Sequence, residues 1–178
     1  MATVTELLSD PESVGVWTLV PGRTRITFRN KTMWGALMVH GAFTEFSGDG
    51  QITNTGEVSG RVNIVAASLN TKLRKRDEDL RGRTFLDVEN YPDIKVVVAA
   101  AEPNGTDTVD VRADLTVKGH TAPIPLHANV EALDDGAVRI STKTTLNRKA
   151  WGVTGNMLGM VGDKTTLWAY LVFQRGVS

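Results

Sequence analysis

Alternation of apolar and polar residues is the feature that most limits what this chain can fold into. Residues 108–118 place Val109, Val111 and Leu115 on one side of an extended chain and charged residues on the other. Residues 123–131 repeat the pattern. A period of two is typical of β-strands that bury one face and leave the other in water. The sequence therefore predicts an all-β protein.

Segments with this character follow one another along most of the chain, separated by turn signals rich in Gly, Asn, Asp and Pro. Residues 47–50 and 119–122 are predicted to be two of the turns. An antiparallel sheet of this size leaves no unpaired edge when it closes on itself, which favours a barrel. The eight expected strands are 23–30, 36–46, 58–66, 94–101, 108–118, 123–131, 137–147 and 165–175.

One internal segment does not show this alternation of apolar and polar residues. The stretch TKLRKRDEDLR has helical character, with Asn70 as the expected N-cap and Gly82 just past its end. Mixed charges within it are typical of a solvated helix face. The sequence predicts a short helical insertion around residues 70–90.

The N-terminal residues differ from the rest. Leu7 and Leu8 are followed by the helix breaker Pro11, so the segment offers little apolar surface, and its deletion is expected to change stability only slightly. A chain of 178 residues is long enough for one sizeable core. We expect an N-terminal arm over residues 1–15 and one barrel domain over residues 16–178.

Composition excludes several partners. Lys plus Arg and Asp plus Glu number 20 each, so no global field draws the chain to nucleic acid or to an anionic membrane. The absence of Cys excludes disulfides and thiolate sites. No stretch approaches the roughly 18 apolar residues of a membrane span, so no stable membrane insertion is expected. The first residues lack the basic and apolar regions of a signal peptide, which predicts a cytoplasmic location.

The sequence contains no strong motif for catalysis or for metal binding. His40, His120 and His127 are far apart in the sequence, and a zinc site needs three or four converging ligands. Asp77 and Asp79 would point to different faces of a helix, so they do not form an acid and base pair. No nucleophile elbow, phosphate loop or dinucleotide fingerprint is present. We therefore predict no catalytic residues, no metal and no cofactor.

Methionine and tryptophan gather in two segments. Residues 33–38 and 151–162 hold two of the four Trp and four of the five Met. Methionine adapts to irregular apolar surfaces, so these segments could rim a binding pocket, with Trp34, Trp151 and Met157 facing a ligand. The alternative, that they plug the barrel end as core, stays open.

Five sequence blocks resemble one known family. In order, they are VHGAFTEFSG (39–48), ASLNTKLRKRD (67–77), RDEDLRGRTFLDVENYPDIKVVV (76–98), ADLTVKGHTAPIPL (113–126) and LNRKAWGVT (146–154). Together they are similar to the YceI-like family of lipocalin-like polyisoprenoid-binding proteins. The resemblance implies an eight-stranded antiparallel lipocalin-like barrel with a helical segment, and it implies no catalytic residues.

The resemblance and the alternation together give the expected site. The family pattern implies that Phe28, Val39 and Phe43 face the interior, that Arg76 and Asp77 anchor the helical insertion, and that Arg148 and Trp151 flank the late hairpin. Alternation adds further inward positions. The full expected ligand-binding set is Phe28, Trp34, Val39, Phe43, Val111, Leu115, Trp151, Met157 and Leu171, with Arg76, Asp77 and Arg148 as structural polar residues.

The expected function is to bind, carry or sequester a long apolar molecule, which the resemblance identifies as a polyisoprenoid, an isoprenoid quinone or a fatty-acid-like lipid. Two alternatives stay open. The first is a structural or interaction module whose barrel is filled by its own side chains. The second is a lipid-acting enzyme that would use Arg76, Asp77, Asp79 or Arg148 for proton transfer. A homodimer also stays open.

Overall fold

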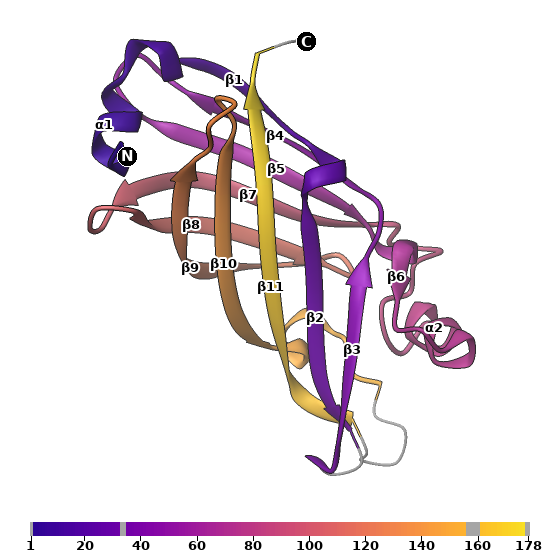
Figure 1. The fold of residues 1–178 in the computed structure, drawn as a ribbon. Helices are drawn as coiled ribbons and strands as arrows, with labels where there is room; N and C mark the ends of the chain where they lie inside the picture. Colours follow the sequence, from indigo (N-terminus) through magenta and orange to yellow (C-terminus); the bar gives the residue numbers. More distant parts are fainter. Residues whose placement is uncertain (1, 33–34, 156–160, 177–178) are drawn as a thin grey trace.

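In the computed structural model, which describes residues 2–32, 35–155 and 161–176, the strands form one antiparallel sheet (Figure 1). The described helices are α1 (Val4–Ser9) and α2 (Arg74–Arg81). The strands are β1 (Gly15–Leu19), β2 (Arg25–Thr32), β3 (Leu37–Phe43), β4 (Phe46–Ile52), β5 (Val58–Val65), β6 (Leu69–Asn70), β7 (Asp93–Pro103), β8 (Thr108–Val117), β9 (His120–Ala132), β10 (Val138–Asn147) and β11 (Val161–Arg175).

Eight of these strands close into a ring. The order runs β1-β4-β5-β7-β8-β9-β10-β11, and β11 pairs back to β1. Trp17 of β1 lies opposite Gly50 of β4 on one side and Arg175 of β11 on the other. Every strand of the ring therefore has two partners. The predicted eight-stranded antiparallel barrel is confirmed.

The long strand β11 belongs to two parts of the sheet. Its C-terminal part pairs with β1, and the part before it pairs with β2, from Tyr170 opposite Arg25 to Val161 opposite Thr32. Strands β3 and β6 continue from β2. We call β2, β3 and β6 the wing. Figure 1 shows β2 and β3 extending downward beside β11, away from α1.

Two turn predictions are wrong. Residues 47–50 lie inside β4, because the two glycines there allow close approach: a Cβ on Gly48 would lie 2.8 Å from the Arg61 carbonyl oxygen. The hairpin between β8 and β9 turns at Lys118 and Gly119, and not over residues 119–122. Both residues have positive φ, 52° and 73°, as a two-residue hairpin turn requires.

The helical insertion is present, with a later start than predicted. Helix α2 begins at Arg74, with Leu73 in the N-cap position and Gly82 in the C-cap position. Asn70 does not cap the helix. Its side-chain oxygen accepts from the Lys72 backbone N–H at 2.9 Å, which forms a local turn that competes with helix.

The N-terminal residues contribute more to the packing than their sequence indicated. Thr3 and Glu6 form a reciprocal capping box that starts α1. Val4 is only 3% exposed and packs against Val109 and Ala128. The expectation of little buried apolar surface here is wrong, because a single turn of helix is enough to direct Val4 into the sheet.

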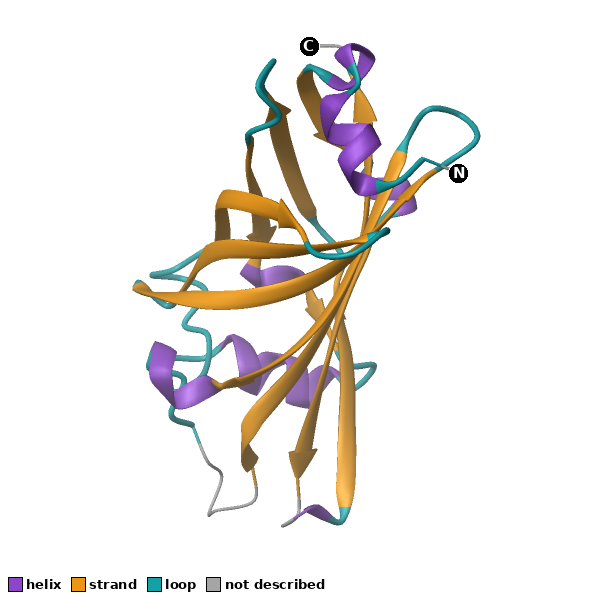
Figure 2. Cartoon of the chain, turned by 90° about the vertical axis from the view of Figure 1, so that its left-hand side faces the viewer, coloured by secondary structure: helices purple, strands orange, loops and turns teal. Residues whose placement is uncertain are grey.

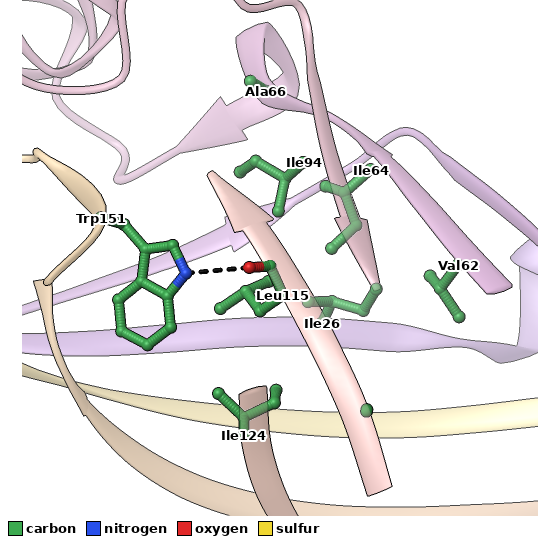
Figure 3. Close-up of a cluster of buried hydrophobic side chains, with 9 residues drawn as sticks. Ile26, Val62, Ile64, Ala66, Ile94, Leu115, Ile124 and Trp151 are labelled. Carbon is green, nitrogen blue, oxygen red and sulfur yellow. Dashed lines mark hydrogen bonds between the residues drawn. The ribbon is translucent and has the colours of Figure 1, made fainter. Parts of the chain in front are cut away.

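Apolar side chains form three clusters along the inside of the barrel. The largest includes Ile26, Ile64, Leu115 and Trp151 (Figure 3). A second surrounds Trp17, and the third lies beneath α1. Figure 2 shows the twisted strands from the side, with helical segments near the upper and the lower end of the sheet. The clusters leave space between them, which is described next.

Candidate functional site: an apolar cavity

A cavity of about 480 Å³ runs through the interior. Its wall is almost wholly apolar and includes residues from every strand of the ring, from α1 and from α2. Binding pockets for small molecules typically have about 300 to 1,000 Å³ and apolar linings. The barrel is therefore not filled by its own side chains.

The alternation of the strands builds this wall. On β2, Ile26, Phe28 and Asn30 line the cavity, and the intervening residues do not. Register aligns these residues with the next strand, since Phe28 lies opposite Leu167 and Ile26 opposite Ala169 of β11. Side chains on alternate positions of paired strands point to the same face of a sheet. The apolar lining is thus continuous across strand boundaries.

Seven residues of the expected ligand-binding set lie on the cavity wall. Trp34 and Met157 fall outside the described residues, so their place at a pocket rim stays a prediction. The seven come from β2, β3, β8, β11 and the 3-10 turn Arg148–Trp151, and they are Phe28, Val39, Phe43, Val111, Leu115, Trp151 and Leu171.

Phe28 and Phe43 form an aromatic corner of the wall. Their ring centroids are 5.4 Å apart with a tilt of 43° between the planes. Phe28 can lie close to β3 because residue 41 is glycine: a Cβ there would lie 2.3 Å from the Phe28 ring. The lack of a side chain at Gly41 therefore allows the Phe28 ring to lie against β3 on the cavity side of the wing.

Trp151 connects the 3-10 turn Arg148–Trp151 to strand β8 of the barrel. Its indole N–H donates to the Leu115 carbonyl at 2.9 Å, so the polar end of the side chain is satisfied while its rings are buried (Figure 3). A Trp in this position serves the core and the cavity wall at once.

Arg148 is a buried cation at the edge of the cavity, with 7% of its area exposed. It donates hydrogen bonds to three backbone carbonyls, those of Val153 at 2.6 Å, Gly162 at 2.9 Å and Val161 at 3.1 Å. Burial lowers the pKa of this guanidinium, and the nearby Asp163 carboxylate partly offsets the effect. Arginine remains protonated in proteins, so Arg148 acts as a fixed clamp on the segment after it.

Arg76 and Asp77 meet at one threonine. The Asp77 carboxylate accepts from the Thr71 backbone N–H at 2.9 Å and from its hydroxyl at 2.5 Å. Arg76 donates to the Thr71 hydroxyl oxygen and to its carbonyl, each at 2.7 Å. Asp77 is buried, and Arg76 borders the cavity. The arrangement fixes the start of α2 beside the cavity.

Polar groups line the cavity where β2 meets the first half of β11. Thr165 of β11 lies opposite Asn30 of β2, and its hydroxyl donates to the Asn30 side-chain oxygen at 2.9 Å. The Asn30 amide donates to the Gly162 carbonyl at 3.1 Å. Thr142 and Thr144 of β10 also line the cavity. This part of the wall offers hydroxyl and amide groups, and polar residues also line the cavity on β4 and β5, at Asp49, Gln51, Ser59 and Arg61.

Several residues of the cavity wall were not among the ligand-binding residues predicted from the sequence. Ile26 and Ala169 could have been found, since they share the inward register of Phe28 and Leu171. Phe85 could not, because it lies in an irregular segment after α2, where alternation gives no guidance. Its ring is buried against Gly155, where a Cβ would lie 2.6 Å from it.

The histidines lie apart from one another. His127 is exposed and contacts the Asp110 carboxylate, and His120 bonds to the Lys118 carbonyl at 2.9 Å. Hydrogen bonds from Asn104 and His127 lower the pKa of Asp110. Within residues 2–32, 35–155 and 161–176, no group of three or more His, Cys, Asp or Glu side chains comes together.

A closed eight-stranded antiparallel barrel around an apolar cavity defines a lipocalin-like protein. The YceI-like domain family matches residues 17–173, and the chain belongs to this family. A UPF0312 protein of Pseudomonas putida is 35% identical over 130 residues, which cover 68% of this chain and 67% of the relative.

Solved structures share the fold. BcnA of Burkholderia cenocepacia superposes with a TM-score of 0.79 at 20% identity, covering 86% of this chain and 98% of BcnA. A polyisoprenoid binding domain from Saccharophagus degradans gives a TM-score of 0.76 at 18% identity, covering 90% and 98%. Among the described helices, none has the length and apolar character to cross a bilayer.

Proposed function

We propose that this protein binds one long apolar molecule inside the barrel and carries or sequesters it. The observation behind the proposal is the cavity of about 480 Å³ with its almost wholly apolar wall. An apolar wall around a cavity of this size gains packing contacts when a hydrocarbon chain lies against it. Family membership adds support, since a structural relative is a polyisoprenoid binding domain.

The chemistry of the wall favours a ligand with a long tail and a small polar end. Each methylene moved from water to the cavity would contribute about 0.8 kcal/mol, so a tail supplies affinity without an ionic anchor. The polar end would lie near Asn30 and Thr165. Polyisoprenoids, isoprenoid quinones and fatty-acid-like lipids all have this form.

We propose binding without turnover. The charged groups that border the cavity are engaged in holding the fold. Arg148 binds three carbonyls, Arg76 binds Thr71, and Asp79 accepts from Lys75 at 2.8 Å. A general acid or base needs a free site facing the substrate. The lipid-acting enzyme is therefore the weaker alternative.

The test is whether purified protein retains a lipid. Mass spectrometry of an organic extract should detect one apolar molecule at close to one per chain. The variant Ala169→Trp places an indole on the cavity wall and should abolish retention. Val97→Trp is the matched control, because Val97 is 52% exposed on β7 and does not line the cavity.

The outcomes separate the alternatives. Retention by the native chain and Val97→Trp, with loss in Ala169→Trp, supports the cavity as the site, provided that circular dichroism shows both variants folded. Equal retention in both variants, or no lipid and no uptake of an offered prenyl or acyl chain, would favour the structural module. A bound lipid that is chemically altered on incubation would favour the enzyme.

A further inference from the structure

Charge is divided unevenly between two groups of four strands, although the whole chain is neutral. Strands β4, β5, β7 and β8 contain three basic residues and five acidic ones: Arg61, Lys95 and Arg112 with Asp49, Asp93, Glu102, Asp110 and Asp114. Strands β2, β3, β10 and β11 contain seven basic residues and one acidic one: Arg25, Arg29, Lys31, Arg139, Lys143, Lys164 and Arg175 with Asp163.

Five of the basic residues share one outer surface. The cavity takes the even-numbered positions of β2 and β10 and, from Thr165 on, the odd-numbered positions of β11, with Trp168 as the exception, so the other positions point outward. Lys143 lies opposite Trp168 in the sheet, and the Arg29 guanidinium lies 5.1 Å and the Lys143 ammonium 5.5 Å from the Trp168 ring, so the two cations are on one face. We call this surface the basic face, formed by Arg25, Arg29, Lys31, Lys143 and Lys164.

The charges of the basic face are not neutralised by the protein. Within the described part of the chain, none of its five residues takes part in an ion pair. On the more acidic group of strands, Arg61 pairs with Asp49 and Arg112 pairs with Glu102. The single acidic side chain of the four strands, Asp163, is held by Lys149 at 3.2 Å. The basic face therefore presents a positive potential to solvent.

Apolar side chains accompany these charges. Tyr170 is 45% exposed on the outer side of β11, between Trp168 and the end of the strand. Met38 at the start of β3 is 42% exposed and lies opposite Lys31 of β2. Aromatic and apolar residues interspersed with Lys and Arg are typical of surfaces that meet lipid headgroups.

We propose that the basic face docks on a lipid bilayer that contains anionic phospholipids. A negatively charged bilayer attracts each nearby Lys or Arg, and neighbouring strands of one sheet face can bring several of them to the surface together. Tyr170 and Met38 would then lie at headgroup depth. This interaction is peripheral, so it differs from membrane insertion.

A bilayer suits this face better than another polyanion. The wall behind the basic face is the β10, β11 and β2 part of the cavity, which includes Phe28 and Leu167. A lipid that is insoluble in water must enter the cavity from a membrane, and docking by this face places the cavity next to its source. This step of the argument rests on the proposed function. The charge distribution does not depend on it.

The experiment measures co-sedimentation of the full chain with vesicles of phosphatidylcholine, with and without about a third phosphatidylglycerol. The test variant is Lys31→Gln, Lys143→Gln and Lys164→Gln. The control variant is Arg61→Gln, Lys95→Gln and Arg112→Gln, which has the same net charge. Each lost lysine should lower partitioning about fivefold, so the test variant should lose roughly a hundredfold and the control less than fivefold.

Three results would overturn the proposal: no binding to anionic vesicles at low salt, equal losses in the two variants, or binding that persists above about 0.5 M salt, where surface charges are screened. A duplex oligonucleotide that binds more tightly than the vesicles would assign the face to nucleic acid. Ala169→Trp separates this proposal from the proposed function, because blocking the cavity should leave vesicle binding unchanged.

Discussion

Different kinds of interaction border the two ends of the cavity. At the upper end in Figure 1, α1 contributes Val4, Leu7 and Leu8, which are apolar and border the cavity. At the lower end, Arg148 clamps three carbonyls. Apolar contacts are non-directional and tolerate movement, whereas a buried cation with fixed acceptors permits one geometry. The lower end is therefore the rigid one.

The largest effect is expected for Arg148→Met. The substitution removes one donor from each of the carbonyls of Val153, Val161 and Gly162, although Gly162 keeps its hydrogen bond from the Asn30 amide, and the expected cost is about 3 to 5 kcal/mol. The melting temperature should fall by roughly 10 °C. Lys149→Met is the control, because Lys149 is exposed, and it should change stability by less than about 0.5 kcal/mol. Similar melting curves for the two variants would refute the clamp.

Asp77→Asn should have a smaller effect at the same end. The amide keeps one acceptor, but it loses the charge that strengthens both hydrogen bonds from Thr71, which costs about 1 to 3 kcal/mol. Urea unfolding should show a lower midpoint with an unchanged slope. The neighbouring Glu78→Gln is the control, since Glu78 makes an exposed pair with Arg74 and should be nearly neutral.

At the apolar end, Val4→Ala should cost about 1 kcal/mol, because the removed methyl groups leave a small space that α1 can close by shifting. Val16→Ala, at a position that is 54% exposed, should cost less. Urea midpoints would compare the two. A loss for Val4→Ala as large as that for Arg148→Met would show that the two ends are equally rigid.

The smallest effect concerns pH at the upper end. The Ala137 backbone N–H and Arg23 stabilise the Asp135 carboxylate and lower its pKa. A carboxylate with a depressed folded-state pKa contributes stability above its unfolded pKa and loses it as pH falls through the folded value. Asp135→Asn should therefore melt slightly below the native chain at pH 7, and the difference should shrink as pH falls from the unfolded pKa of Asp through the lowered folded pKa. A constant difference would assign the effect to packing.

Most of the fold could be predicted from the alternation, because a period of two specifies which residues face inward whatever the topology. Strands β1 and β4 were missed, because residues 15–19 lie before the first expected strand and residues 47–50 were expected to turn. The course of β4 depends on glycines such as Gly48, whose effect comes from close approach to the neighbouring strand β5. The burial of Val4 was also hidden, because short helices owe their stability to packing.

For the site, the sequence predicts which residues point inward, but it does not predict which of them border a cavity and which are packed in the core. Ala113 and Ala169 have the same small side chain on inward positions, yet Ala113 is packed in the cluster of Trp151 and only Ala169 borders the cavity. Neutral composition likewise predicted no polyanionic partner. Composition sums charges over the chain and carries no information on how closure of the sheet distributes them.

The pairing of β1 with β11 has a consequence for synthesis. Strand β1 can pair with β11 only after β11, the last strand of this sheet in chain order, has left the ribosome. Until then β1, β2 and β10 each have one edge without a partner strand. Such edges invite association between nascent chains. The lifetime of the protein in its most aggregation-prone form is therefore set by how soon residues 161–175 emerge and how fast so non-local a contact forms.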